Sequence, residues 1–306
     1  MERQRKTAMK RSRPESLWGR SKGSPTGNRI FIQLISRFGV TPAYALAAFV
    51  SLRYALCDRA SADAIRSFRT RLGLPTHTIH LWRHFYYFAV SLIDRLAFLL
   101  ERAPEFSFET SGKDNFIEAL SPGRGLIVVS AHVGNWELAG NMLAEEVPTR
   151  VNVVMRDAER PEIRRILETA TKRRRVTVIP AGEDSVSAMI PIRRALERAE
   201  IVCMLGDRRW GSREKKVPFL GAPASFPAGP WEIAAILGSP ILPLFVRKCS
   251  RRGYSLTVHP AEHPAGTGTL RKQAIAESMA HFVNDLELFV SRYPFEWHNF
   301  HDFWAA

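Results

Sequence analysis

The chain has 306 residues, 45% of them hydrophobic, and its 44 Lys and Arg against 30 Asp and Glu give a formal charge of +14 at pH 7. This length is ample for a real hydrophobic core, and three widely spaced cysteines (Cys57, Cys203 and Cys249) exclude a disulfide framework or a zinc set and indicate buried free thiols in a reducing compartment. The charge favours a polyanionic partner, which could be nucleic acid, an anionic membrane surface or an acidic protein.

The N-terminal part of the chain is first basic and then apolar. Residues 1–27 are predicted to form a disordered basic tail, because the first 29 residues hold nine Lys or Arg, two acids and no apolar stretch typical of a secretory signal. Residues 28–110 are predicted to form a helical, membrane-associating region, whose first apolar segment divides into two helices at Pro42. The second run, residues 42–52, ends at Arg53 and is too short to span a membrane, so it is either a buried core helix or a helix in the membrane interface.

Two further helices are expected at residues 61–72 and 76–100. In the second, His77, His80 and His84 share one helical face. A metal site there is weakly supported, because no neighbouring carboxylate or cysteine completes a ligand set. Packing, or placement at an interface, is the favoured interpretation.

From Gly112 onwards, apolar strands alternate with helices. Strands that are apolar on both faces indicate an α/β fold, with a mostly parallel central sheet flanked by helices. We therefore predict an α/β body at residues 111–306, forming a single domain with the helical region packed on it. The expected strands are 126–130, 150–155, 176–180, 201–206, 241–246 and 254–258, and the expected helices are 113–120, 136–146, 161–172, 185–199, 229–237 and 270–291.

The most informative stretch is GLIVVSAHVGNWE, residues 125–137. A buried strand leads into His132, a turn follows at Gly134 and Asn135, and a helix carries Glu137. A histidine with a nearby carboxylate is a base-and-orienter pair, and the two side chains can meet only if His132 precedes the helix and Glu137 lies in its first turn. A structural histidine is the alternative, but parallel sheets place their sites at strand ends. Ser130 is not expected to be a nucleophile, because the G-x-S-x-G elbow is absent.

Other charged residues follow neighbouring strands. Asp207 comes just after the strand at 201–206, so it should share a sheet edge with His132. Arg208 begins a basic loop that could bind an anion or be solvated, and Arg156 could clamp a phosphate or pair with Asp157.

The C-terminal residues 293–304, YPFEWHNFHDFW, hold six aromatic side chains. This aromatic tail is expected to pack on the core, with a membrane-interface belt as the alternative. The basic run at residues 172–175 lacks any nucleic-acid-binding signature, so no nucleic-acid partner is expected.

The motifs KDNFIEAL, AHVGNWE, VVMRD and GDRRWGSREKKVPFLGAP, in this order, carry a family likeness. The string His-x4-Glu resembles the H-x4-D/E motif of glycerolipid acyltransferases. The whole run, residues 112–258, is similar to the bacterial lipid A biosynthesis (late) acyltransferase family. A DRRW block stands where phospholipid acyltransferases have P-E-G-T-R, which leaves the acceptor open.

The resemblance implies transfer of a fatty acyl chain from acyl carrier protein or coenzyme A to a hydroxyl of a lipid or glycolipid, such as a lipid A precursor, at the cytoplasmic face of the inner membrane. It makes His132 the general base and Glu137 its orienting carboxylate. Asn135, Arg156, Asp207 and Arg208 are the predicted substrate-binding residues. No metal and no cofactor are expected beyond the acyl thioester as co-substrate. An acidic carrier protein and an anionic membrane surface would both suit the basic chain.

Two other functions remain open. A non-catalytic membrane- or nucleic-acid-binding protein on an acyltransferase scaffold would also account for the charge. A hydrolase that uses the same histidine on a thioester is the weaker alternative.

Overall fold

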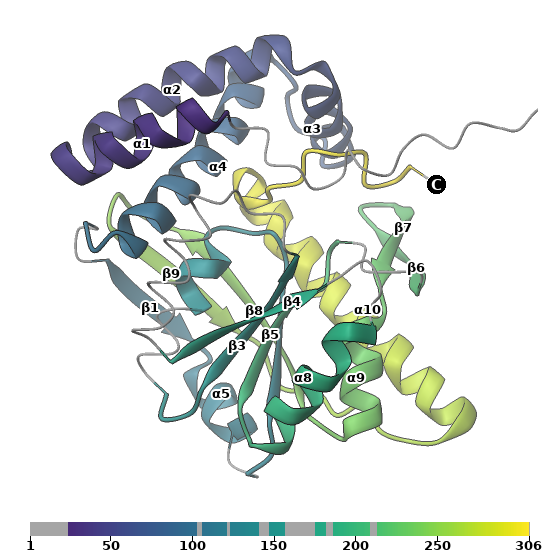
Figure 1. Cartoon of the computed structure of the whole chain (residues 1–306). Helices are drawn as coiled ribbons and strands as arrows, with labels where there is room; N and C mark the ends of the chain where they lie inside the picture. Colours follow the sequence, from purple (N-terminus) through teal and green to yellow (C-terminus); the bar gives the residue numbers. More distant parts are fainter. Residues whose placement is uncertain are drawn as a thin grey trace, which may run out of the picture.

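A seven-stranded sheet forms the centre of the molecule (Figure 1). The structure is a computed structural model that describes residues 24–102, 106–120, 123–140, 147–156, 175–181, 186–208 and 213–305, with the backbone alone at 156, 186 and 187. The strand order is β1-β9-β8-β2-β5-β3-β4, and all neighbours are parallel except β8 and β9. This confirms the α/β fold with a mostly parallel sheet. The strands are β1 (Ser107–Ser111), β2 (Leu126–Ser130), β3 (Val151–Arg156), β4 (Val176–Ala181), β5 (Ile201–Leu205), β8 (Ile241–Lys248) and β9 (Gly253–Val258).

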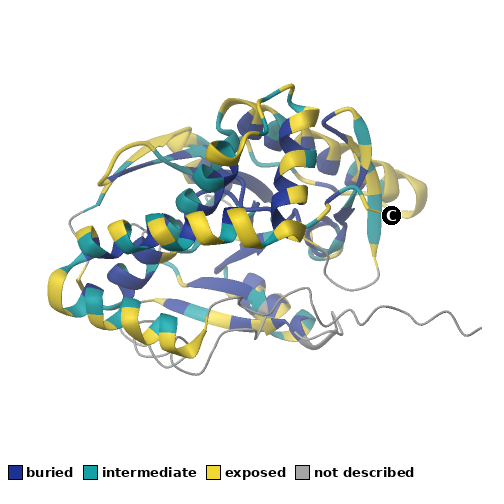
Figure 2. Cartoon of the chain, turned by 90° about the horizontal axis from the view of Figure 1, so that it is seen from above, coloured by how far each residue is buried: buried dark blue, intermediate teal, exposed yellow. Residues whose placement is uncertain are grey.

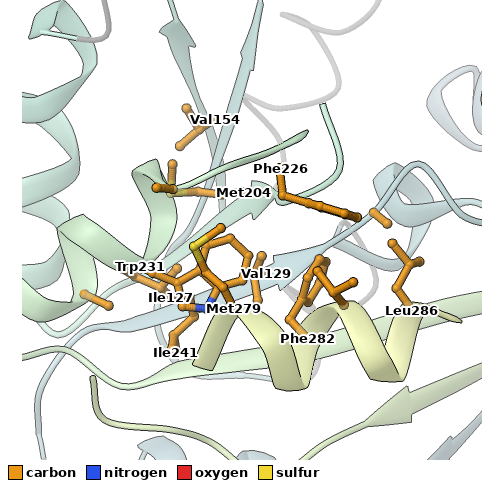
Figure 3. Close-up of a cluster of buried hydrophobic side chains, with 14 of the residues drawn as sticks. Ile127, Val129, Val154, Met204, Phe226, Trp231, Ile241, Met279, Phe282 and Leu286 are labelled. Atoms are coloured by element: carbon orange, nitrogen blue, oxygen red, sulfur yellow. The ribbon is translucent and has the colours of Figure 1, made fainter. Parts of the chain in front are cut away.

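Both faces of the sheet are buried. Successive side chains of a strand point to opposite sides of the sheet, and all five residues of β2 are buried. In β2, Ile127 and Val129 enter a core that includes Trp231 and Phe282, whereas Leu126 and Val128 enter a second core on the other face. Figure 3 shows the first core, in which side chains from the sheet meet those of two helices. The described helices of the body are α5 (Lys113–Leu120), α8 (Val186–Glu197), α9 (Gly229–Leu237) and α10 (Gly268–Arg292).

The N-terminal region is helical, as expected, with different boundaries. The helices are α1 (Pro25–Phe38), α2 (Val40–Cys57), α3 (Arg59–Arg71) and α4 (Thr78–Leu99). Helix α1 begins inside the predicted tail, because the Ser24 hydroxyl caps the amide of Gly27 at 2.9 Å. The rest of that tail, residues 1–23, lies outside the described residues.

The break between α1 and α2 lies at Gly39 and not at Pro42. Gly39 has a φ of +76°, which ends α1, while Pro42 falls in the first turn of α2, where a helix leaves its N–H groups unpaired. Arg53 does not end α2, because its side chain is exposed and the helix continues to Cys57. By length and composition, α2 is the one helix of the described residues that is suited to cross a membrane.

The helical region is tied to the body by a buried polar cluster. Asp94 of α4, which is fully buried, is hydrogen-bonded to Tyr44 of α2, to Lys248 of β8 and to Tyr254 of β9. A buried carboxylate is tolerated when it is paired and hydrogen-bonded, so this arrangement fixes α4 against the sheet. In Figure 2, the central strands are largely buried, while the helices carry exposed outer faces.

Three strands have no counterpart among the predicted elements. β1 is a sheet edge whose side chains are mostly exposed. β6 (Glu214–Phe219) and β7 (Ala222–Pro227) form a separate hairpin in what was predicted to be a loop, and its turn at Leu220 and Gly221 has positive φ at both positions, as tight hairpins require. The predicted helix 161–172 and the second half of 136–146 lie outside the described residues.

Candidate active site

His132 lies two residues beyond the carboxyl end of β2, in a turn that only glycine permits. Gly134 has a φ of +54°, and a Cβ atom there would lie 2.0 Å from the carbonyl oxygen of Val246. β2 and β5 pair in parallel with Ser130 opposite Leu205. Because His132 and Asp207 each lie two residues beyond this pair, register brings them side by side, as the shared sheet edge predicted.

Asp207 holds His132 by both its oxygens. The Nδ1 atom of His132 lies 2.8 Å from Oδ1 of Asp207, and the backbone amide of His132 donates to Oδ2 at 2.9 Å. The Asp207 side chain is 3% exposed and that of His132 is 21% exposed. The carboxylate is therefore buried, and the imidazole it orients retains access to solvent.

The electrostatics of this pair favour a neutral histidine and an ionised aspartate. Burial and the nearby Arg208 lower the pKa of His132, against the opposing effect of Asp207. Burial alone would raise the pKa of Asp207, but the interaction with His132 and the hydrogen bonds from His132 and Trp297 hold it at about 2. An ionised carboxylate accepts a hydrogen bond from Nδ1–H, so Nε2 carries the free lone pair. Among the described residues, none is hydrogen-bonded to Nε2.

The C-terminal tail forms part of the site, a role that the sequence did not reveal. Trp297, which is 1% exposed, donates its indole Nε1–H to Oδ2 of Asp207 at 3.1 Å. The backbone of the tail pairs with the His132 turn: Gly134 N donates to the carbonyl of Glu296 at 2.8 Å, and His298 N donates to the carbonyl of His132 at 2.8 Å. The tail packs on the core through Trp297 and Phe303, which agrees with the favoured expectation for it.

Glu137 is not placed as predicted. Both of its carboxylate oxygens accept from Nη1 of Arg95 on α4 at 2.6 Å. The carboxylate that orients His132 through Nδ1 is that of Asp207. The predicted pairing of His132 with Glu137 is therefore corrected. The physical reason is that the turn directs the first helical residues toward α4, where a partly buried arginine offers the carboxylate a cation.

Asn135 is buried and used within the protein. Its side-chain oxygen accepts from the amide of Leu138 at 3.3 Å, which caps the helix after the turn, and its Nδ2 donates to the carbonyl of Ser91 at 2.9 Å. Its predicted contact with substrate stays a prediction. These bonds show that it holds the His132 turn against α4.

The two predicted arginines share the sheet edge with His132. Arg208 follows Asp207, is exposed, and lies near enough to lower the pKa of His132. Arg156 ends β3, whose carboxyl end lies at the same edge because β3 runs parallel to β5. The side chain of Arg156 lies outside what the structure describes.

Among the described residues, which include His77, His80 and His84, no group of three His, Cys, Asp or Glu is placed to hold a metal ion. The fold and the His132–Asp207 pair together define an α/β protein with a solvent-accessible, carboxylate-oriented imidazole at the carboxyl edge of a parallel sheet. Such a group can take a proton from a hydroxyl.

The chain belongs to the family described as bacterial lipid A biosynthesis acyltransferase, whose model matches residues 82–306. Among curated proteins, it is 25% identical over 198 residues to a phosphatidylinositol mannoside acyltransferase of Mycobacterium tuberculosis, a match that covers 64% of this chain and 59% of that protein. It is 26% identical over 197 residues to the protein of the same name from Mycolicibacterium smegmatis, covering 63% and 61%. The chain thus spans about three fifths of the length of these relatives.

Proposed function

We propose that this chain is an O-acyltransferase that moves a fatty acyl chain from an acyl thioester, carried by acyl carrier protein or coenzyme A, to a hydroxyl of a lipid or glycolipid. The observation that carries this proposal is the His132–Asp207 pair, with Nδ1 bound to an ionised carboxylate and Nε2 left available as a base. Family membership and relatives that are named acyltransferases support it.

The reaction follows from this geometry. Nε2 of His132 takes the proton of the acceptor hydroxyl as its oxygen attacks the thioester carbonyl carbon. Asp207 stabilises the imidazolium that forms, in the way a buried aspartate does in a catalytic triad. The carbon–sulfur bond then breaks, and the departing thiolate takes the proton back from His132. The new ester and the free thiol balance the reaction without a covalent acyl-enzyme.

We assign the acceptor to the lipids and glycolipids, with a lipid A precursor and a phosphatidylinositol mannoside as the two specific candidates. The first candidate comes from the family and the second from the names of the relatives. The excess positive charge of the chain suits either acceptor if it carries phosphate, and it also suits an acidic acyl carrier protein.

We also propose that the protein works at the cytoplasmic face of the inner membrane, with α2 against the bilayer. Phe49, Leu56 and Phe38 expose 74%, 63% and 70% of their surface on α2 and at the end of α1. Phe49 and Leu56 are seven residues apart and so share one face of α2, and large apolar side chains exposed on one helix face are typical of a membrane contact. Phe49→Glu should therefore reduce binding to anionic vesicles while the fold is kept, as measured by flotation and circular dichroism.

The test of the activity is His132→Ala, assayed for acyl transfer to a purified glycolipid acceptor. The matched control is His259→Ala. His259 is also paired with an aspartate, Asp285, at 3.0 Å, but it follows β9, which is separated from β2 by β8, and its partner lies on α10. We expect a loss of at least about a thousandfold for His132→Ala and near-normal activity for the control. Normal transfer by His132→Ala would refute the proposal. Release of free fatty acid without acceptor would show a hydrolase instead.

A further inference from the structure

A group of basic side chains surrounds the ring of Phe295, just before the tail residues that contact His132. The guanidinium carbon of Arg83 lies 4.2 Å from the ring centroid and that of Arg69 lies 5.1 Å away. The imidazoles of His84 and His80 lie at 4.9 Å and 6.4 Å. We call Arg69, Arg83, His80 and His84 the Phe295 cluster.

Among the described residues, no carboxylate forms an ion pair with this cluster. Arg69 is 2% exposed, and its Nε donates to the carbonyl of Pro75 at 2.5 Å while Nη1 lies 3.3 Å from Nε2 of His84. Arg83 has the Phe295 ring as its contact there, and no hydrogen-bond acceptor for it occurs in the part of the chain that the structure describes. Burial and the neighbouring cations Arg69 and Arg83 lower the pKa of His80.

Positive charges held together without an anion repel each other, and a buried arginine ordinarily requires a carboxylate or phosphate partner. The structure therefore offers a site in which an anion would find the guanidinium of Arg83, with the positive charge of the buried Arg69 behind it. Close to these guanidinium groups, Nδ1 of His80 is buried and has no hydrogen-bond partner among the described residues. Arginine favours phosphate, whose oxygens accept paired N–H groups.

The surroundings indicate that the phosphate belongs to a lipid. His80 and Arg83 lie on α4 next to Ile79 and Trp82, which line an apolar groove of about 360 Å³ with Phe49 and Leu52 of α2. A cationic cluster beside an apolar groove matches a molecule with a phosphate headgroup and hydrocarbon chains.

The cluster also adjoins the active site. The Phe68 ring contacts His84 at 5.9 Å and Trp297 at 4.8 Å, and Trp297 is bonded to Asp207. A series of ring contacts and one hydrogen bond therefore connects the cluster to the carboxylate that orients the base.

We propose that the Phe295 cluster binds the phosphate of a lipid headgroup and so recognises the acceptor as a phospholipid or phosphoglycolipid. Its link to the acceptor rests on the proposed acyltransferase function, whereas phosphate binding itself does not. The cluster is built from residues of α3, α4 and the tail and includes neither Arg156 nor Arg208, so it is a second anion site and not the predicted one.

The experiment compares wild type, Arg83→Met and Arg66→Met, without any acyl donor. Arg66 is a matched control, because it lies on α3, is exposed, and is paired with Asp63, so its loss changes the net charge equally. Affinity is measured for phosphatidylcholine vesicles with and without phosphatidylinositol. Thermal protection by inorganic phosphate is measured alongside, and His80→Gln is a second variant in case Arg83→Met does not fold.

We expect Arg83→Met to weaken binding to the phosphatidylinositol vesicles about tenfold and to abolish protection by phosphate, with Arg66→Met within twofold of wild type. Equal losses in both variants would show nonspecific charge and overturn the proposal. Protection by phosphate that depends on Arg83, with vesicle binding unchanged, would show a free-phosphate site and overturn the lipid assignment. Because binding is measured without turnover, an absence of acyl transfer would overturn the proposed function and leave this result intact.

Discussion

Replacing Trp297 by phenylalanine tests whether the C-terminal tail controls the base. The substitution removes the indole N–H that Oδ2 of Asp207 accepts at 3.1 Å. It keeps an aromatic ring in contact with Phe68 and Phe219, whose centroids lie 4.8 Å and 5.5 Å from that of Trp297. The change is therefore aimed at one hydrogen bond to the carboxylate that orients His132.

The expected magnitudes follow from that bond. A hydrogen bond to a charged group contributes about 1.5–3 kcal/mol, and a smaller ring in a fully buried site costs about 1 kcal/mol more, so the free energy of unfolding should fall by about 2.5–4 kcal/mol. With one donor lost, the charge of Asp207 acts more strongly on the protonated form of His132. If a third to a half of the bond energy is transferred, the protonated form of His132 is stabilised by about 0.5–1.5 kcal/mol, and the pKa of His132 rises accordingly.

The measurement is the pH dependence of kcat/KM for thioester consumption in the presence of acceptor. Activity requires neutral His132 and so falls as the pH drops through its pKa, and the acid limb of Trp297→Phe should move to higher pH. The control is Trp304→Phe, because Trp304 is in the same tail but donates its indole N–H to the carbonyl of Phe219 at 3.2 Å. That variant should lose stability and keep the wild-type acid limb. An unmoved or lowered acid limb in Trp297→Phe would refute the reasoning.

Three further predictions concern the same edge of the sheet. Arg208→Met should move the acid limb of the kcat/KM profile to higher pH, because Arg208 lowers the pKa of His132. An unchanged pH profile would contradict this. Burial lowers the pKa of His298 to about 3, so its contribution to the free energy of unfolding is complete above the unfolded-state pKa near 6.5 and is lost as the pH falls toward 3. At pH 5 the loss from this group is about 2 kcal/mol. His298→Gln should flatten this pH dependence of stability, as measured by urea titrations at several pH values. Gly134→Ala should lower the free energy of unfolding by at least about 2 kcal/mol, because of its φ and the clash with Val246, and equal urea midpoints would contradict this.

The elements that the sequence predicted well have strong local signals. The strand at 126–130 and the helices at 113–120 and 229–237 have the predicted bounds, because each is an apolar or periodic run with clear ends. β1 was missed because its five residues are mostly polar and exposed, so only its pairing with β9 defines it. The β6–β7 hairpin was missed because its Leu-Gly turn lacks the common Asn-Gly signal.

Some features of the site could likewise be predicted from nearby residues, whereas others depend on contacts between residues far apart in the sequence. His132 at a strand end and Asp207 at the same edge follow from the pattern of parallel strands. The orienting carboxylate was assigned to Glu137 because it is five residues away, whereas the true neighbour of His132 is set by the register of β2 with β5, 75 residues along the chain. Register depends on the packing of the whole sheet and cannot be read from either strand alone. Trp297 carried no local signal, since its role depends on where the tail returns.

Helix α4 links the apolar surface of the N-terminal helices to the base. Two consecutive residues anchor it to different parts of the body: Asp94 to Lys248 of the sheet, and Arg95 to Glu137 of the helix that follows the His132 turn. Because a broken buried ion pair leaves an uncompensated charge, these two anchors resist both rotation and sliding of the helix. Any surface that α2 contacts is therefore held at a fixed distance from His132. If that surface is a membrane, the base meets acceptor hydroxyls at one depth of the headgroup layer, so the anchors of α4 contribute to the choice of hydroxyl.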